Sequence, residues 1–476
     1  MRSRMKIHQP VALALTLLAV SCVMGCAVLT PTDAYRAIAP RYSIPGVSPT
    51  LSANLRSSQA AGEITLDLAV ELAVANNPEL AAAGFDAEAA KARKDAARGA
   101  LLPRISAEGG YTRYLDDQRL IPARFNGEPG VFGDDIFSGD VVVRMPLFTG
   151  GKLLNEMRAA DLLRQSAEQR MVRTREELVF NVSSVFFGIL AQEHIVKSLE
   201  FSKEALEAHL KRVNDLIAAQ KAAKVDRLRT EVRLSDVEQK LVREKNALAI
   251  QHRLMANLIG VEEPATSLRL VGTLEQTMPD LQPPADCVSA AFARRPDYLA
   301  ARKELEAQAR RVDVARAGHS PTVSLLGSYG ERWAVNPNRE PTGTKDAEDV
   351  GRIGIGVELP LFESGRTQAR VREERAKLAA SQERFRKLGL QIRLEVETVL
   401  SNVTSAFERM QTTEKAIELA RETLRIEREK YELAKGTILD VLDAQATLLE
   451  TETNFYQALA DFNTAKAQVQ LTMGEM

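Results

Sequence analysis

The chain has 476 residues, with 63 Lys and Arg against 64 Asp and Glu, so it is long enough for two or three ordinary domains and nearly neutral. This charge balance gives no reason to expect a nucleic-acid partner. Aromatic residues make up only 5%, while Ala, Leu, Glu, Arg and Lys abound, which is typical of long helices and not of a β-sandwich.

The N-terminus reads as an export signal. Basic residues precede the apolar stretch "VALALTLLAV", which is too short to span a bilayer as a helix. Cys26 follows the small Gly25, which resembles a bacterial lipoprotein processing site, so residues 1–25 are predicted to be a signal peptide and Cys26 the acylated residue. Cys22 is an alternative acylation site, and an ordinary signal peptide with incidental cysteines is a third interpretation. Val28 stands where an inner-membrane retention signal would have Asp, which favours the outer membrane.

An internal repeat governs the rest of the chain. "NNPELAAA" at 76–83 matches "RRPDYLAA" at 294–301 with a shift of 218, and "MPLFTGGK" at 145–152 matches "LPLFESGR" at 359–366 with a shift of 214. The length difference between the copies lies in one loop, 115–137 in the first copy and 334–349 in the second. Each copy is predicted to run helix, strand, loop, strand, long helix, reversal, helix.

This repeat gives the predicted boundaries. An N-terminal extended segment covers 26–62, and the remaining segments are a first helix at 63–103, a β-hairpin at 104–146, a long helical hairpin at 147–262, a linker at 263–285, a second first helix at 286–320, a second β-hairpin at 321–360 and a second long helical hairpin at 361–476.

The predicted strands alternate between apolar and small or polar residues. In "RIGIGVELPLF" one face carries Ile353, Ile355, Val357 and Leu359, and the other carries Gly354, Gly356 and Glu358. The first copy repeats the apolar face, and aromatic residues suited to a membrane interface lie toward the loops: Val141, Val143 and Met145, then Tyr111, Tyr114, Tyr329 and Trp333. After the signal peptide no segment has 18 consecutive uncharged apolar residues, so a membrane crossing would need the strands of a closed barrel. A soluble hairpin on a core is the alternative, but the chain has little other apolar sequence to cover such a face.

Long helical patterns follow the strands. From Arg366 to about Lys435 apolar residues recur mostly every three, four or seven positions without a proline, so roughly 70 residues at 1.5 Å each predict a helix about 100 Å long. Such a helix needs neighbours along its whole length to bury its apolar stripe.

The joint between strand and helix occurs twice. Pro146 and Pro360 lack an N–H and suit the end of a strand ladder. Phe148 and Phe362 are predicted to pack between strands and helices, and Gly151 and Gly365 to leave room for the bend.

Taken together, these motifs resemble the TolC-like outer-membrane efflux channels, most closely the acylated drug-efflux members. The matching residues are "NPEL", "RPDY", "LLPRIS", "HSPTVS", both copies of "PLF" and "GTILDVLDAQ" at 436–445, within about residues 63–476. The resemblance implies a mainly α fold with membrane β: a homotrimer in which four strands per protomer close a twelve-stranded barrel in outer-membrane lipid, above a coiled-coil periplasmic tunnel. The apolar strand faces would then meet lipid, and Gly354, Gly356 and Glu358 would line the lumen.

The resemblance also implies a periplasmic gate. Asp440 and Asp443 match acidic rings at the tunnel entrance, and Asp226 matches a residue that links neighbouring helices. The alternative is that Asp440 and Asp443 are solvated residues at a helix start. Two gate partners of some members fall on apolar Leu433 and Ile438, so Lys224 or Arg227 would have to replace them.

The same resemblance predicts that the helix reversals contact a periplasmic adaptor, which bridges to an inner-membrane pump. The expected contact residues are Val225, Leu228, Gly436, Leu439 and Leu442, and Gly436 can take a positive φ at its turn. Packing of these side chains inside the coiled coil is the alternative.

No catalytic constellation accompanies these features. The His residues form neither HExxH nor a Cys/His metal pattern, and "GGK" lacks the first Gly and the Ser or Thr of a phosphate loop. The chain is therefore predicted to be no enzyme, to need no metal or cofactor, and to be a lipid-anchored passive exit duct of a tripartite efflux system. Type I protein secretion and metal-ion efflux are alternatives within the channel class, and a soluble coiled-coil scaffold is a remote one.

Overall fold

The computed structural model describes residues 63–220, 223–260, 269–334, 337–342, 347–433 and 435–476. All described residues belong to one unit of the chain, Ser48–Met476. The predicted signal peptide, Cys22, Cys26 and the segment 26–62 lie outside the described residues, as do parts of the predicted linker and of the loop 334–349.

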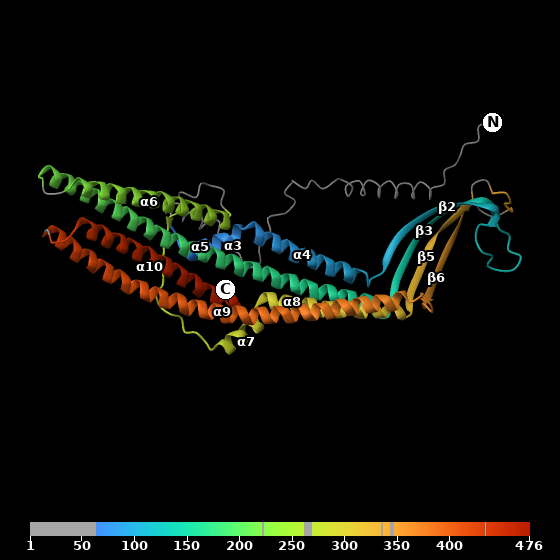
Figure 1. Cartoon of the computed structure of the whole chain (residues 1–476). Helices are drawn as coiled ribbons and strands as arrows, with labels where there is room; N and C mark the ends of the chain where they lie inside the picture. Colours follow the sequence, from blue (N-terminus) through green and yellow to red (C-terminus); the bar gives the residue numbers. More distant parts are fainter. Residues whose placement is uncertain (1–62, 221–222, 261–268, 335–336, 343–346, 434) are drawn as a thin grey trace, which may run out of the picture. The chain divides into compact units, whose positions relative to one another are not determined.

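The same series of elements occurs twice along the described chain (Figure 1). The first copy consists of β1 (Glu63–Ile64), α3 (Leu66–Asn76), α4 (Pro78–Gly99), β2 (Arg104–Arg119), β3 (Phe132–Phe148), α5 (Lys152–Ala218) and α6 (Lys224–Leu258). The second consists of β4 (Arg269–Leu270), α7 (Pro284–Arg294), α8 (Pro296–Arg316), the 3-10 turn η2 (Ala317–His319), β5 (Thr322–Ala334), β6 (Ala347–Glu358), α9 (Arg366–Glu432) and α10 (Ile438–Met473).

The first helix of each copy is two helices and not one as predicted. Asn77 and Arg295 are extended, with ψ near 120°, and a proline follows each of them at the start of the next helix. Proline disfavours the helical conformation in the residue before it, so Pro78 and Pro296 break the predicted segments 63–103 and 286–320. A short parallel pairing of β1 with β4, which was not predicted, joins the start of the first copy to the linker.

Four strands form one antiparallel sheet in the order β2-β3-β5-β6. The first hairpin is longer than predicted, because β2 runs to Arg119 and β3 begins at Phe132. Residues 120–131 connect them, in place of the predicted loop 115–137. The outer strands of the sheet, β2 and β6, come from different copies of the repeat.

Below the sheet the helices also form layers of four. The first part of α5 contacts α4 and α8 and its later part contacts α6 and α10, while α9 contacts α8 and then α10. The order is therefore α4-α5-α8-α9, followed further along by α6-α5-α10-α9. Both α5 and α9 have 67 residues, which corresponds to about 100 Å each.

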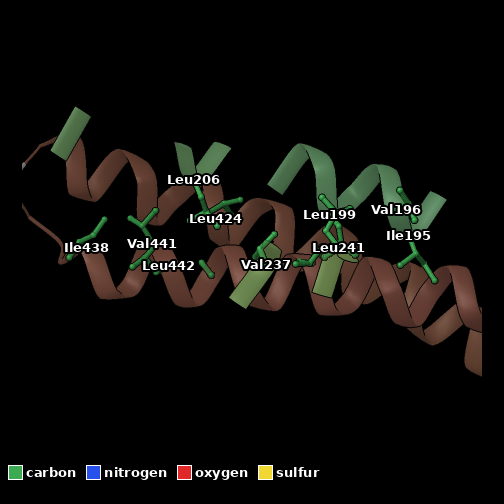
Figure 2. Packing of buried hydrophobic residues seen from close by; sticks show 12 residues of the cluster. Ile195, Val196, Leu199, Leu206, Val237, Leu241, Leu424, Ile438, Val441 and Leu442 are labelled. Carbon is green, nitrogen blue, oxygen red and sulfur yellow. The ribbon is translucent and has the colours of Figure 1, made fainter. Parts of the chain in front are cut away.

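An apolar core lies where these later helices meet. Figure 2 shows Leu199 on α5, Val237 on α6, Leu424 on α9 and Val441 on α10 within one buried cluster. By length and composition α5 is the one described helix apolar enough to cross a membrane, over an 18-residue stretch. Half of that stretch is buried inside the protein, as expected for the central helix of a bundle.

Candidate membrane sheet, strand–helix joints and hairpin tips

The sheet has one apolar face, as the alternation predicted. The register places Ile353 beside Gly327 and Val143, and Ile355 beside Leu325 and Met145. These apolar side chains are open to the surroundings, with Ile353 80% and Ile355 67% exposed. A solvated sheet would normally bury such a face.

The opposite face of the sheet is charged. Arg144 pairs with Glu108 at 2.8 Å, and Arg332 pairs with Asp140 at 2.8 Å across β5 and β3. Gly354 and Gly356 belong to this face too, because Gly354 lies opposite Leu326 and Gly356 opposite Ser324. Two chemically different surfaces are therefore separated by one sheet.

Aromatic rings gather on the apolar face toward the loops. Tyr111 and Phe137 lie 4.8 Å apart between ring centroids, and Phe137 and Trp333 lie 5.7 Å apart with nearly parallel rings. Tyr329 is 62% exposed on the same face. Tyr114 lies in a stretch of β2 where the register is interrupted.

Both strand–helix joints use two successive left-handed residues. The φ angles are 61° at Gly150 and 81° at Gly151, and 51° at Ser364 and 78° at Gly365. Gly151 and Gly365 are the N-caps of α5 and α9, in a left-handed conformation that glycine adopts without strain. A Cβ added at Gly150 would lie 2.3 Å from the Cβ of Ser320, so only glycine fits there.

Two predictions about the joints were wrong. β6 ends before Pro360, but β3 continues past Pro146 to Phe148, because a register shift between these residues accommodates the missing N–H. Phe148 and Phe362 do not pack a seam within the described chain, since they are 49% and 87% exposed.

At the hairpin tips, Asp440 and Asp226 both act as helix caps. The Asp440 carboxylate accepts hydrogen bonds from the backbone N–H of Thr437 at 2.9 Å and from its hydroxyl at 2.7 Å, which lower the pKa of Asp440. The Asp226 carboxylate accepts one bond, from the N–H of Ala223 at 3.2 Å. Capping is what the helix-start interpretation predicted for Asp440.

Asp443 has a different setting. It is exposed and lines a cleft of about 370 Å³ between α6 and α10, together with Leu228, Val232 and Leu439. Arg229 also lines this cleft. Asp443 is therefore the gate candidate that does not serve as a cap.

Three of the predicted adaptor contacts are accessible. Val225, Leu228 and Leu439 are between 44% and 48% exposed. Leu442 is only 4% exposed and belongs to the core cluster, so this prediction was wrong and the coiled-coil alternative holds for it. Gly436 is half-buried against Lys430, and its φ angle is not positive. The turn therefore does not use the left-handed conformation that the sequence analysis allowed for this glycine.

Within the described part of this one chain, neither Lys224 nor Arg227 forms an ion pair with another helix. Arg227 lies 3.4 Å from Glu231 of its own helix. Near the tips the two hairpins instead meet through an ion pair between Arg212 and Glu432 at 3.0 Å and through the rings of His209 and Tyr431. Burial lowers the pKa of His209, and nearby Arg212 lowers it further. Sequence reasoning missed these contacts because ordinary charged residues on a long helix carry no signal of their partners.

A buried charge network lies where α5, α8 and α9 meet. Arg295 is 4% exposed, and its guanidinium donates to Asp297 at 2.9 Å and to Glu395 at 2.7 Å. Glu176 is also 4% exposed, and burial raises its pKa to about 7 although Arg173 lies 3.7 Å away. Among the described residues no group of three His, Cys, Asp or Glu side chains could hold a metal ion.

Comparisons with known proteins agree with this architecture. The sequence model of the family described as "Outer membrane efflux protein" matches residues 69–261 and 287–475. The chain is 22% identical over 403 residues to the outer membrane protein TolC of Vibrio cholerae, covering 84% of this chain and 88% of the relative. It is 24% identical over 440 residues to the toluene efflux pump outer membrane protein TtgC of Pseudomonas putida, covering 87% and 83%.

A solved structure with the same fold is the outer membrane protein VceC from Vibrio cholerae. It superposes with a TM-score of 0.73 at 19% identity, covering 86% of this chain and 96% of VceC.

Proposed function

The chain belongs to the outer membrane efflux protein family, and on this premise we propose that three copies of it form the exit duct of a tripartite efflux system. Members of this family are efflux channels of the outer membrane and not enzymes. In this proposal the duct is passive, and transport is energised elsewhere in the tripartite system.

The unpaired edges of the sheet and of the helical layer support the proposal of a trimer. The sheet ends in β2 on one side and β6 on the other, and a membrane sheet cannot leave such strand edges unpaired in lipid. The outer helices α6 and α9 carry exposed apolar residues along their length: Val232, Val242, Ile250 and Leu254, then Leu390, Leu394, Leu419 and Ile426. Because one edge comes from each copy of the repeat, successive chains can join edge to edge until the ring closes.

The two faces of the sheet support the assignment of lipid and lumen. The exposed apolar face with Ile353 and Ile355 suits acyl chains, and the aromatic group of Tyr111, Phe137 and Trp333 suits the outer membrane interface. The face with the Arg144–Glu108 and Arg332–Asp140 pairs suits a water-filled lumen.

At the opposite end the tips form the gate and the partner surface. Asp443 is the gate residue that we favour, since Asp440 and Asp226 also stabilise their helix starts. Val225, Leu228 and Leu439 contact the periplasmic adaptor, which links the duct to an inner-membrane pump. Acylation of Cys26, or of Cys22, anchors the chain to the membrane. In such a system the pump largely chooses the cargo.

The observation that carries the proposal is the open apolar face of the sheet above a helical layer about 100 Å long. Purified protein should require detergent for extraction and should conduct ions in planar bilayers. Asp443→Ala should raise the conductance by removing a ring of like charges, whereas Glu450→Ala on the same helix should not. Recovery without detergent, or an absence of conductance, would contradict the proposal.

A further inference from the structure

The strand–helix joints expose an apolar belt. Leu361 and Phe362 are 88% and 87% exposed, and Leu359, Leu147 and Phe148 are each about half exposed. Leu147 and Phe148 are the last residues of β3, and Leu359, Leu361 and Phe362 follow β6, so all five lie at the ends of strands whose apolar face is open. The belt therefore continues the apolar surface of the sheet toward the helices.

A positively charged cleft lies directly beneath this belt. It has a volume of about 340 Å³ and is lined by Lys152, Arg311, Arg370, Thr367, Glu373 and Glu374. Lys377 pairs with both carboxylates, with Glu373 at 2.6 Å and with Glu374 at 2.7 Å, and so offsets one of their two negative charges.

The basic side chains of the cleft lack such partners. Among the described residues neither Lys152 nor Arg370 forms a salt bridge, and Arg311 donates only to the side chain of Gln308, at 3.2 Å. The three cations of the cleft therefore outnumber the one carboxylate charge that Lys377 leaves uncompensated, and the cleft is net positive.

The depth of the cleft matches that of lipid headgroups. Lys152 is the first residue of α5 and Arg370 the fifth of α9, so both lie within about 6 Å of the helix starts. The polar layer of one leaflet is roughly 5–8 Å thick. If the apolar belt is surrounded by the acyl chains of the bilayer, the cleft lies at the depth of the lipid phosphates.

We propose that both joints sit in the periplasmic leaflet and that the cleft of Lys152, Arg311 and Arg370 binds the phosphate of an anionic phospholipid headgroup. This inference rests on the proposed function, because it needs the sheet to lie in a membrane. Continuity with the apolar face of the sheet favours lipid over a neighbouring copy of the chain as the occupant of the belt.

The test uses the full chain in vesicles of phosphatidylcholine and phosphatidylglycerol, with brominated acyl chains on one lipid at a time as tryptophan quenchers. Trp333 is the single tryptophan of the chain, so its quenching first reports membrane insertion. In the Trp333→Phe background, Phe362→Trp should be quenched, and more strongly when phosphatidylglycerol carries the bromine. Leu390→Trp, on an exposed part of α9 far from the sheet, should not be quenched.

The headgroup preference should depend on the cleft. Lys152→Gln with Arg370→Gln should reduce the preference for phosphatidylglycerol by about fivefold for each side chain removed. Lys152→Arg with Arg370→Lys should keep it, and Arg386→Gln with Arg393→Gln further along α9 should leave it unchanged.

Each outcome is decisive. Quenching of Trp333 without quenching of the Phe362→Trp variant would show that a neighbouring copy covers the belt, which overturns this inference and leaves the channel intact. Equal quenching by both brominated lipids would overturn the headgroup site. If Trp333 itself were not quenched, the proposed function would fail first.

Discussion

The two bends that open the copies of the repeat share a backbone shape but not a chemistry. At the first, the side chain of Asn77 accepts from the N–H of Glu79 at 2.9 Å and donates to the carbonyl of Leu258 at 3.1 Å. At the second, Arg295 is buried and pairs with Asp297 and Glu395. The prolines that follow set the bend in both cases, so the side chain before each was free to acquire a different role.

Substitution of Arg295 should have a large effect on stability and tests the difference between the two bends. Arg295→Ala truncates a buried side chain and leaves the partly exposed Asp297 and Glu395 without their cation, which should cost about 2–3 kcal/mol of stability. Asn77→Ala removes a helix cap and should cost about 1–2 kcal/mol. Denaturant unfolding in detergent measures both, and equal losses would refute the difference in chemistry.

An effect of similar size is expected at the two strand–helix joints, where substitutions at the matching positions Gly150 and Ser364 should change stability in opposite directions. Gly150→Ala puts a Cβ against Ser320 and forces a left-handed alanine, so it should cost about 3 kcal/mol. Ser364→Gly relieves a left-handed serine at the matching position and should be neutral or stabilising by about 1 kcal/mol. The same unfolding measurement checks this, and a tolerated Gly150→Ala would mean that the joint can rearrange.

Glu176 should make stability depend on pH. Its folded-state pKa of about 7 lies above its unfolded value, so its contribution is complete below about pH 4 and is lost as the pH rises through 7. Glu176→Gln should therefore match the unsubstituted chain at low pH and exceed it in stability by about 3 kcal/mol above pH 8. Unfolding curves measured across this pH range check the prediction. A difference in stability between Glu176→Gln and the unsubstituted chain that did not change with pH would contradict it.

The smallest effects on stability are expected at the hairpin tips, where Asp440 and Asp226 stabilise the starts of α10 and α6. Asp440→Ala removes both hydrogen bonds to Thr437 and should cost about 1 kcal/mol. Asp226→Ala removes one bond to Ala223 and should cost about half as much. Hydrogen exchange at the first turns of α10 and α6 reports this locally, and the reverse order would show that other contacts hold the tips.

The repeated features were predictable from the sequence. The two "PLF" motifs fixed the ends of the strands to within a few residues, and the uninterrupted pattern after Arg366 gave the length of α9. Alternation in β6 correctly separated Ile353 from Gly354. The end of β2 could not be predicted, because "RYLDDQR" has no alternation to mark a strand.

Other features depend on tertiary contacts that no local pattern carries. A charged residue such as Arg295 is normally exposed, and only its partners on α8 and α9 make its burial possible. The two-residue pairing of β1 with β4 is too short for any periodicity. At the tips, helical spacing alone could not distinguish exposed Leu439 from buried Leu442.

The equal lengths of α5 and α9 limit how such a chain can grow. Each added residue turns everything beyond it by about 100° and shifts it by 1.5 Å, so a single insertion would move an apolar stripe off its neighbour. Seven residues make nearly two whole turns and restore the phase. A longer version of this protein should therefore arise in steps of about seven residues, taken together in α5, α6, α9 and α10.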